Sequence, residues 1–166
     1  MRALLAFPLL LLLTTRAFGQ TGTGDEEGID VLTAQYIAAH LTKGDRVAID
    51  TSNAFLTDSV WTKRRQQNAV RILARELAAE IGSLSAYRSC ESENLNTCSL
   101  HGIDVVVSIS TATISGDSAV VDIRVLRNVG FQSGRTGLVR RYQQLLLRRD
   151  GSTWVVVGFL PGSSIS

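Results

Sequence analysis

Residues 103–130, IDVVVSISTATISGDSAVVDIRVLRNVG, decide the fold class of this chain. Both halves of the stretch are rich in β-branched residues, and the turn signal at residues 115–117 separates them. This pattern predicts two antiparallel strands joined by a hairpin. Two further apolar runs follow, and Asp150 and Gly151 between them favour a two-residue hairpin turn. We therefore expect a four-stranded antiparallel meander at about 103–114, 118–128, 138–148 and 153–160.

The first hairpin allows two registers. A two-residue turn would pair Ile109 with Arg124, whereas a three-residue loop from Ser115 to Asp117 would pair Ile109 with Ile123. A shift of one residue moves every side chain of a strand to the other face of the sheet. We favour the second register, because it buries the valines and isoleucines of both strands on one face, and burial outweighs one turn preference.

Two amphipathic helices are expected before the strands. The first begins at Asp30 as its N-cap and ends at Gly44, with His40 near its C-terminus, where an imidazole suits the helix dipole. The second ends at Gly82. Its apolar stripe consists of Ala69, Val70, Leu73, Ala74, Leu77 and Ile81.

Short strands are predicted at residues 46–50 and 83–88. Neither helix can bury its apolar stripe without the sheet, so we expect one α+β domain over residues 29–162. In this arrangement the two helices pack against the meander.

The N-terminal stretch MRALLAFPLLLLLTTRAFG is typical of a secretory signal peptide. Arg2 precedes an apolar run of eleven residues, and Ala17, Phe18 and Gly19 form a small-residue cleavage signal. The run is shorter than the roughly 20 residues that a membrane-spanning helix needs. We expect residues 1–19 to be removed, residues 20–28 to form a flexible N-terminus, and the mature chain to be secreted or periplasmic without a membrane span.

Cleavage changes the charge of the chain. The full sequence has 17 Lys and Arg against 15 Asp and Glu, and loss of Arg2 and Arg16 leaves 15 of each. A neutral, exported chain with 6% aromatic residues is a poor candidate for binding nucleic acid. The charge is nevertheless uneven, because seven arginines and no acidic residue lie between Ile123 and Arg149.

Cys90 and Cys98 lie in the polar stretch RSCESENLNTCSLHG. Two cysteines in one short loop of an exported protein predict a disulfide. A closed loop of this size stabilises the fold by about 2.5 kcal/mol in the chain-entropy model. A metal site that includes His101 is disfavoured, because structural zinc needs four ligands and usually paired cysteine spacing.

The arginine-rich strands supply the candidate binding residues. Arg124, Arg140 and Arg141 are candidate anion-binding residues, because guanidinium groups match carboxylate and phosphate oxygens. The alternative is that these arginines flank strands and pair with the acidic N-terminal half. Asp122 and Tyr142 are candidate pocket residues on a concave face of the sheet.

Motifs of nucleophilic, phosphate-binding or metal-dependent enzymes do not occur in the sequence. We therefore assign no catalytic residue, cofactor or metal, and we favour a non-catalytic binding or interaction module whose partner is an unknown small molecule or protein. An alternative is a structural subunit of a homodimer, because the apolar runs at residues 145–147 and 155–157 would be apolar on both faces of the sheet.

The order of helix, short strand, helix and meander resembles the NTF2-like superfamily, also called the cystatin-like α+β roll. The closing stretch GSTWVVVGFL at residues 151–160 is similar to the last hairpin of that group. The resemblance implies a roll fold, and its members include isomerases, dehydratases and non-catalytic binding or dimerisation modules. A small enzyme of the isomerase or dehydratase type with a sheet-lined pocket is thus a further alternative. The chain as a whole is also similar to exported bacterial proteins.

Overall fold

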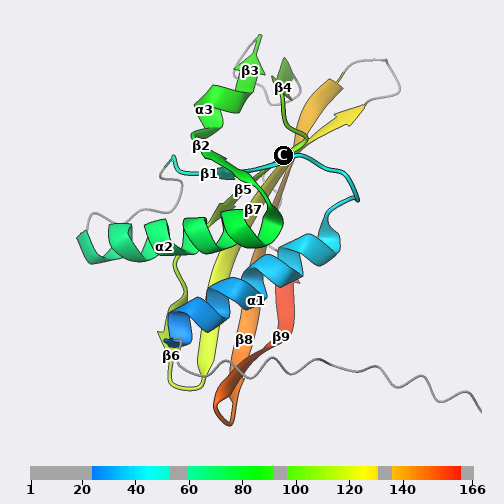
Figure 1. The fold of residues 1–166 in the computed structure, drawn as a ribbon. Coiled ribbons are helices and arrows are strands. Elements are labelled where there is room, and N and C mark those ends of the chain that lie inside the picture. Colours follow the sequence, from blue (N-terminus) through cyan, green and yellow to red (C-terminus); the bar gives the residue numbers. More distant parts are fainter. Residues whose placement is uncertain (1–23, 53–59, 92–96, 131–135, 162–166) are drawn as a thin grey trace, which may run out of the picture.

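The computed structural model describes residues 24–52, 60–91, 97–130 and 136–161 (Figure 1). The predicted signal peptide, residues 1–19, lies outside the described residues. The elements, in chain order, are α1 (Asp25–His40), β1 (Val47–Asp50), α2 (Val60–Leu77), β2 (Glu80–Gly82), α3 (Leu84–Tyr87), β3 (Arg88–Cys90), β4 (Cys98–Leu100), β5 (Val105–Ile109), β6 (Thr113–Ser115), β7 (Ser118–Gly130), β8 (Thr136–Asp150) and β9 (Thr153–Pro161).

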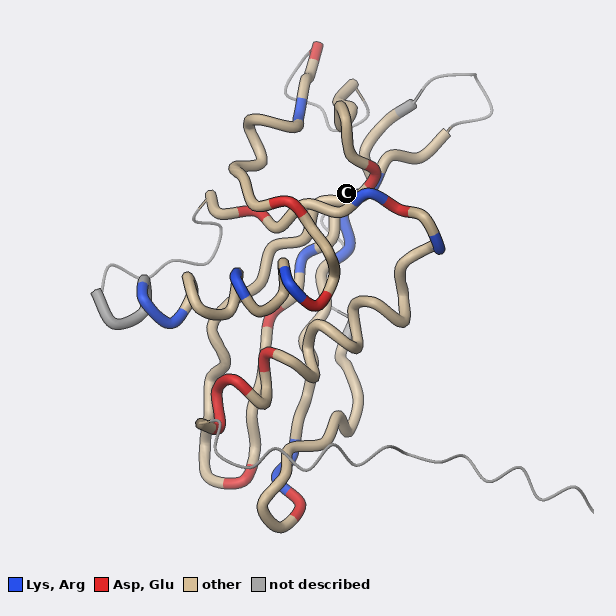
Figure 2. Tube along the Cα trace, viewed as in Figure 1, with Lys and Arg blue, Asp and Glu red and all other residues tan. Residues whose placement is uncertain are grey.

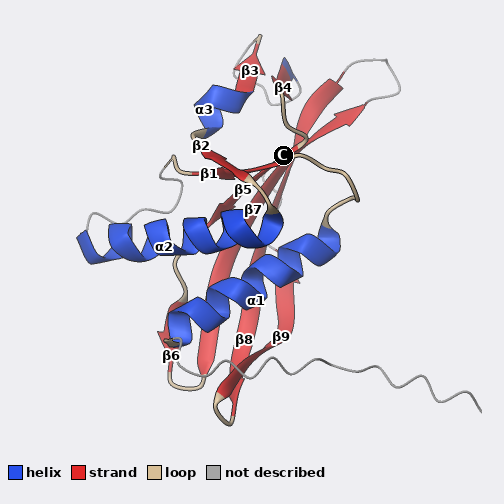
Figure 3. Cartoon of the chain, viewed as in Figure 1, coloured by secondary structure: helices blue, strands red, loops and turns tan. Residues whose placement is uncertain are grey.

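One large sheet organises the described part of the chain. Its seven strands follow the order β2-β1-β5-β7-β8-β9, and β6 pairs with β7 outside this path. Helices α1 and α2 cover one face of the sheet, whereas α3 and the β3–β4 hairpin form a separate unit near one end (Figure 3). None of the described helices is long and apolar enough to cross a membrane.

The α+β class is confirmed, but the prediction of four strands was too low. The predicted strand at 103–114 is two strands, β5 and β6. The short strand at 46–50 joins the sheet as β1, which pairs in parallel with β5 through Val47 and Val105. All four β1 residues are buried, as expected for a parallel strand with both faces covered.

Both registers considered for the first hairpin occur, on different strands. Strand β5 pairs Ile109 with Ile123, as the hydrophobic pattern predicts, whereas β6 pairs Ser115 with Ser118 around a two-residue turn. Gly116 in that turn has a φ of 57°, a conformation that glycine adopts at little cost. Residues 110–112 lie between β5 and β6. These three residues lie opposite only two residues of β7, which accounts for the difference of one residue between the two registers.

Side chains of α2 stabilise this break between β5 and β6. Gln66 donates to the carbonyl oxygen of Ile109 at 3.5 Å, and Arg65 donates to the carbonyl oxygen of Ala112 at 3.5 Å. These bonds satisfy backbone groups beside the interrupted strand. The last hairpin also differs from the prediction by one residue. Its turn residues are Gly151 and Ser152, because Asp150 pairs with Thr153.

Helix α1 begins earlier than predicted. Residues 25–28, assigned by composition to a flexible segment, form its first turn, which carries Asp25, Glu26 and Glu27. Acidic residues are favourable there because the helix dipole is positive at the N-terminus. Asp30 is therefore not the N-cap but a buried residue inside the helix. The helix ends at His40, which confirms the expected position of that residue.

The end of α2 and the segment that follows it also correct the prediction. Helix α2 stops at Leu77, and Ala78 has a φ of 48°. Ile81, predicted on the buried stripe of the helix, lies on β2, pairs with Ile49 and is exposed. The expected strand at 83–88 is mainly the short helix α3. The sequence pattern did not reveal that the chain turns here to add a parallel strand beside β1.

The sheet separates two hydrophobic cores of unequal size. The larger core lies under α1 and α2 and includes Ile29, Leu73, Ile123 and Leu145. The smaller one lies on the opposite face, under the α3–β3–β4 unit. Residues on β7 alternate between the two cores because successive side chains of a strand point to opposite faces. The smaller core consists of Ala48, Cys98, Leu100, Ile103, Val106, Leu126 and Leu138.

Candidate functional site

A pocket of about 240 Å³ opens between the C-terminal half of α1 and the sheet. Most of its wall is apolar, and it contains two arginines, Arg127 and Arg141. The lining residues are Tyr36, Ile37, His40 and Leu41 from α1, Ile123, Val125, Arg127 and Val129 from β7, and Val139, Arg141 and Gln143 from β8.

The two arginines of the pocket differ in how they are held. Arg127 forms an ion pair with Asp45 and donates to the Thr42 hydroxyl at 2.9 Å. Arg141 is exposed and has no hydrogen bond or ion pair with another described residue. It is paired in register with Val125, so its side chain shares the pocket face of the sheet. The described lining residues include no Asp or Glu, so Arg141 supplies the unbalanced positive charge of the pocket, whereas the charge of Arg127 is paired with Asp45.

His40 and Tyr36 provide the other polar groups of the pocket. Nδ1 of His40 lies 2.7 Å from the carbonyl oxygen of Tyr36. A carbonyl only accepts, so Nδ1 donates and Nε2 is the ring nitrogen that faces other partners. The Tyr36 ring packs 4.3 Å from the His40 ring and 6.1 Å from the Phe159 ring. Its hydroxyl is buried without a hydrogen-bond partner among the described residues, and burial raises the pKa of Tyr36.

The structure divides the three candidate anion-binding arginines between the two faces of the sheet. Arg141 lines the pocket, whereas Arg124 and Arg140 lie on the opposite face, the face of Leu126. Sequence reasoning missed Arg127. Its position offered a signal, because it follows Ile123 and Val125 at alternate positions of the same strand.

Asp122 and Tyr142 also lie on the face opposite the pocket. The Tyr142 hydroxyl donates to Asp122 Oδ1 at 2.5 Å, and Gln144 Nε2 donates to the same oxygen at 2.9 Å. The hydrogen bond to Asp122, followed by burial, raises the pKa of Tyr142. The two candidates thus contact each other but do not line the cavity, and their role in binding a ligand stays a prediction.

A buried carboxylate that sequence reasoning missed organises this opposite face. The Asp50 side chain is fully buried and accepts five hydrogen bonds. The donors are the amide and hydroxyl of Ser52, the amide of Leu84, the hydroxyl of Ser108 and the guanidinium of Arg124. Burial lowers the pKa of Arg124, with smaller contributions from the nearby Arg140 and Arg88, while Asp50 opposes the shift.

Several arginines of the strands form ion pairs with acidic residues of the N-terminal half. This agrees with the alternative to anion binding that the sequence pattern allows. Arg127 pairs with Asp45, and Arg124 pairs with Asp50. Arg149 pairs with Asp25 in the first turn of α1. Figure 2 colours the Lys and Arg residues blue and the Asp and Glu residues red along the chain. The remaining positive charge, which includes Arg140 and Arg141, is therefore the part that is open to other partners.

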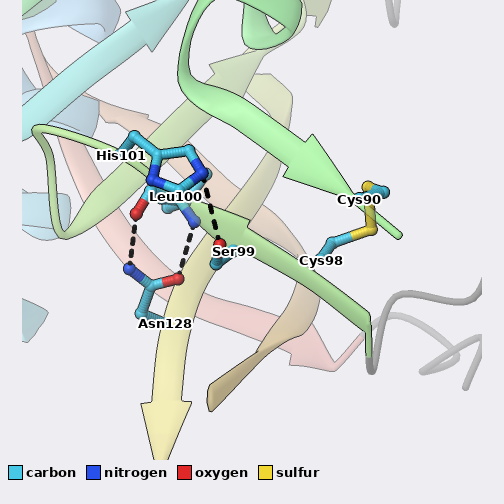
Figure 4. The surroundings of a disulfide bond; sticks show 6 residues. All are labelled: Cys90, Cys98, Ser99, Leu100, His101 and Asn128. Carbon is cyan, nitrogen blue, oxygen red and sulfur yellow. Dashed lines mark hydrogen bonds between the residues drawn. A yellow bond between two sulfur atoms is a disulfide. The ribbon is translucent and has the colours of Figure 1, made fainter. Parts of the chain in front are cut away.

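The predicted disulfide between Cys90 and Cys98 is confirmed (Figure 4). It joins β3 to β4, and Cys98 is buried in the smaller core. The Asn128 side chain connects this unit to the sheet: its Nδ2 donates to the Leu100 carbonyl at 3.1 Å, and its Oδ1 accepts from the Leu100 amide at 2.8 Å. The disulfide unit is thus fixed to β7 by a two-bond clamp.

The apolar runs at 145–147 and 155–157 are only partly covered. Leu145 and Leu147 are buried in the larger core. On β9, however, four apolar side chains are between 38% and 53% exposed, namely Val156, Val157, Phe159 and Leu160. Whether a second copy of the chain covers them stays a prediction.

Comparisons with known proteins add little to this geometry. No family model matches the chain, and a search of curated proteins finds no match. Among solved structures, the chain is similar to one described as a calcium/calmodulin dependent protein kinase II association domain from Xanthomonas campestris. The identity is 13%, the TM-score is 0.24, and the match covers 81% of this chain and 78% of that one. At this TM-score, the likeness carries no functional argument.

Proposed function

We propose that the protein is an exported binding module whose pocket takes a small anion with an apolar body, such as an aromatic or short aliphatic carboxylate. The observation that carries the proposal is that Arg127 and Arg141 both line an apolar cavity that has no described lining carboxylate. A guanidinium beside apolar walls favours an anionic ligand, because the interaction is stronger where water is excluded.

The pocket also limits the size of the ligand. Its volume of about 240 Å³ is below the roughly 300–1,000 Å³ of sites for drug-sized molecules. Arg127 is oriented by Asp45 and Thr42, so it is pre-organised for a carboxylate. Arg141 supplies positive charge that no described carboxylate balances. The apolar walls from α1, β7 and β8 would contact the body of the ligand.

Binding is favoured over catalysis by the groups that line the pocket. A catalytic site of this size needs a nucleophile or an acid–base pair within reach of one reacting atom. The described lining contains His40 and Tyr36 but no carboxylate, thiol or serine hydroxyl beside them. Asp122, the candidate acid of the enzyme alternative, lies on the other face of the sheet.

Isothermal titration calorimetry with benzoate, and with benzamide as its neutral counterpart, tests the pocket. We expect benzoate to bind and benzamide to bind at least about tenfold more weakly, because a charged hydrogen bond is lost. Arg141→Gln should weaken the binding of benzoate to a similar extent. Arg148→Gln is the matched control, since Arg148 is exposed on the same strand outside the pocket. Equal affinities for benzoate and benzamide, or equal losses in the two variants, would contradict the proposal.

The export part of the proposal is supported by the signal-peptide pattern of residues 1–19 and by the disulfide, which persists in oxidising compartments. Mass spectrometry of protein recovered outside the cytoplasm should give a chain that begins at Gln20. Recovery of a cytoplasmic chain that retains Met1 would refute export without affecting the pocket.

A further inference from the structure

Two arginines lie on the face of the sheet opposite the pocket, and a third lies in the disulfide unit that packs on this face. Arg124 lies on β7 and Arg140 on β8. Arg140 is paired in register with Leu126, two residues from Arg124, so the two side chains are diagonal neighbours on one face. Arg88 is the first residue of β3 in the disulfide unit, which packs on this face, and it is paired in register with Leu100 of the smaller core.

The described carboxylates on this face include Asp50, Asp122 and Glu80, which is in register with Ala48 of the smaller core and accepts a hydrogen bond from Tyr87. Asp50 interacts with Arg124, but it also accepts four hydrogen bonds from Ser52, Leu84 and Ser108. Asp122 is on the same face, and its Oδ1 accepts hydrogen bonds from Tyr142 and Gln144. Neither Arg88 nor Arg140 forms an ion pair with a described carboxylate.

Arg140 carries the clearest sign of a missing acceptor. Its Nε is buried and has no hydrogen-bond partner in the described part of the chain. Buried donors in proteins rarely lack a hydrogen-bond partner, because the loss of the bond to water costs free energy. The same guanidinium lies beside the smaller core, where Leu126 and Leu138 are buried. An anion at this position would satisfy both the donor and the charge.

The disulfide unit packs against the same face of the sheet as these arginines. Leu84 and Tyr87 of α3 pack against the smaller core, and the Leu84 amide is bound to Asp50. The Asn128 clamp holds β4 against β7. The unit is therefore fixed on the face that carries Arg124 and Arg140, and Arg88 belongs to it.

We propose that Arg88, Arg124 and Arg140 form a second anion site, which takes a tetrahedral oxyanion of the phosphate type. Guanidinium groups that come from three elements offer donors from several directions, which suits three or four oxygens better than the two oxygens of a planar carboxylate. This site lies on the opposite face of the sheet and does not depend on the pocket proposed above.

Calorimetric titration of the oxidised protein with inorganic phosphate, at constant ionic strength, tests the site. We expect saturable binding below about 20 mM and at least about tenfold weaker binding in Arg140→Gln, because a charge-assisted contact is removed. Arg88→Gln, at an exposed position, should weaken the binding of phosphate by at least about threefold. Arg148→Gln is the matched control and should bind phosphate like the unmodified protein.

Further arms separate the possible sources and shapes of the anion. Acetate should bind more weakly than phosphate, and phenyl phosphate shows whether a phosphate ester fits as well as the free ion. Absence of saturation by phosphate and phenyl phosphate, equal affinity for acetate, or equal losses in Arg140→Gln and Arg148→Gln would overturn the proposal. Circular dichroism of each variant distinguishes loss of the site from loss of the fold, and Arg88→Gln tests the site without changing a buried group.

Discussion

Among the described residues, one buried aspartate lies on each side of the sheet, and the two sides hold it in different ways. Asp30 in α1, on the helix-covered side, is 6% exposed and has no hydrogen-bond partner among the described residues. Burial, assisted by Glu26 and Glu27 and opposed by Arg65, raises its pKa to about 7. Asp50, on the opposite side, is 3% exposed and accepts five hydrogen bonds.

This difference shows two ways to tolerate a carboxylate away from water. Around Asp50, donors from four residues replace the lost hydration. Around Asp30, binding a proton removes the charge instead. The hydrogen-bond network around Asp50 can thus position further charged groups, whereas the helix-covered side keeps Asp30 in a mainly apolar core without such a network.

The largest expected effect comes from Asp50→Ala. Loss of this carboxylate removes one acceptor of Arg124 and the acceptor of the Ser108 hydroxyl and the Leu84 amide, and breaking a buried charge pair costs about 3–5 kcal/mol. Urea denaturation followed by circular dichroism measures the loss. Ser52→Ala, which removes a single donor, should cost only about 1 kcal/mol. Similar stabilities of the two variants would show that Asp50 does not organise this face.

Asp30→Asn should stabilise the protein at pH 8 but not at pH 4. The pKa of Asp30 is about 7 in the folded chain against 3.8 as its ordinary value, so the folded state binds a proton that the unfolded state releases. Stability from this residue is therefore present below pH 4 and is lost as the pH rises to about 7, by up to about 4 kcal/mol. Urea denaturation of both proteins between pH 4 and 8 measures this difference. A difference that is independent of pH would contradict the assignment.

A smaller effect is expected from removing the disulfide. The double variant Cys90→Ser, Cys98→Ser should lose about 2.5 kcal/mol in the chain-entropy model. Hydrogen exchange should increase in β3 and β4 and remain nearly unchanged in α1, because the disulfide unit packs only on the Asp50 side. Reduction of the unmodified protein should have the same effect. Equal increases in both regions would show that the two faces are not independent.

The sequence predicted the parts of the fold that depend on long periodic strands. The alternation along β5 and β7 was long enough to predict the buried register of Ile109 and Ile123. Short elements were predicted less well, because β2 and α3 span only a few residues and their conformation depends on packing against β1 and the smaller core. Asp30 resembled an N-cap, but the acidic residues before it extend the helix.

The candidate site was predicted only in part, for a related reason. The sequence identified an arginine-rich sheet, and the parity of Arg140 and Arg141 already places them on opposite faces. Which face carries a pocket depends on α1, whose contact with the sheet is not visible in local sequence. Asp50 was missed because its donors come from distant segments, such as Ser108 and Arg124.

The interruption between β5 and β6 gives this hairpin an asymmetric tolerance to changes in length. Residues 110–112 let the turn at Gly116 and the core pair Ile109–Ile123 each keep a preferred register. In the structure, these three residues lie opposite only Asp122 and Val121 of β7. A deleted residue there leaves two residues opposite two, so regular antiparallel pairing then joins the register of the core pair to that of the turn. An added residue leaves four residues opposite two and enlarges the break, next to the backbone groups that Arg65 and Gln66 bind. Removal of one residue at 110–112 should therefore be accepted more readily than an insertion.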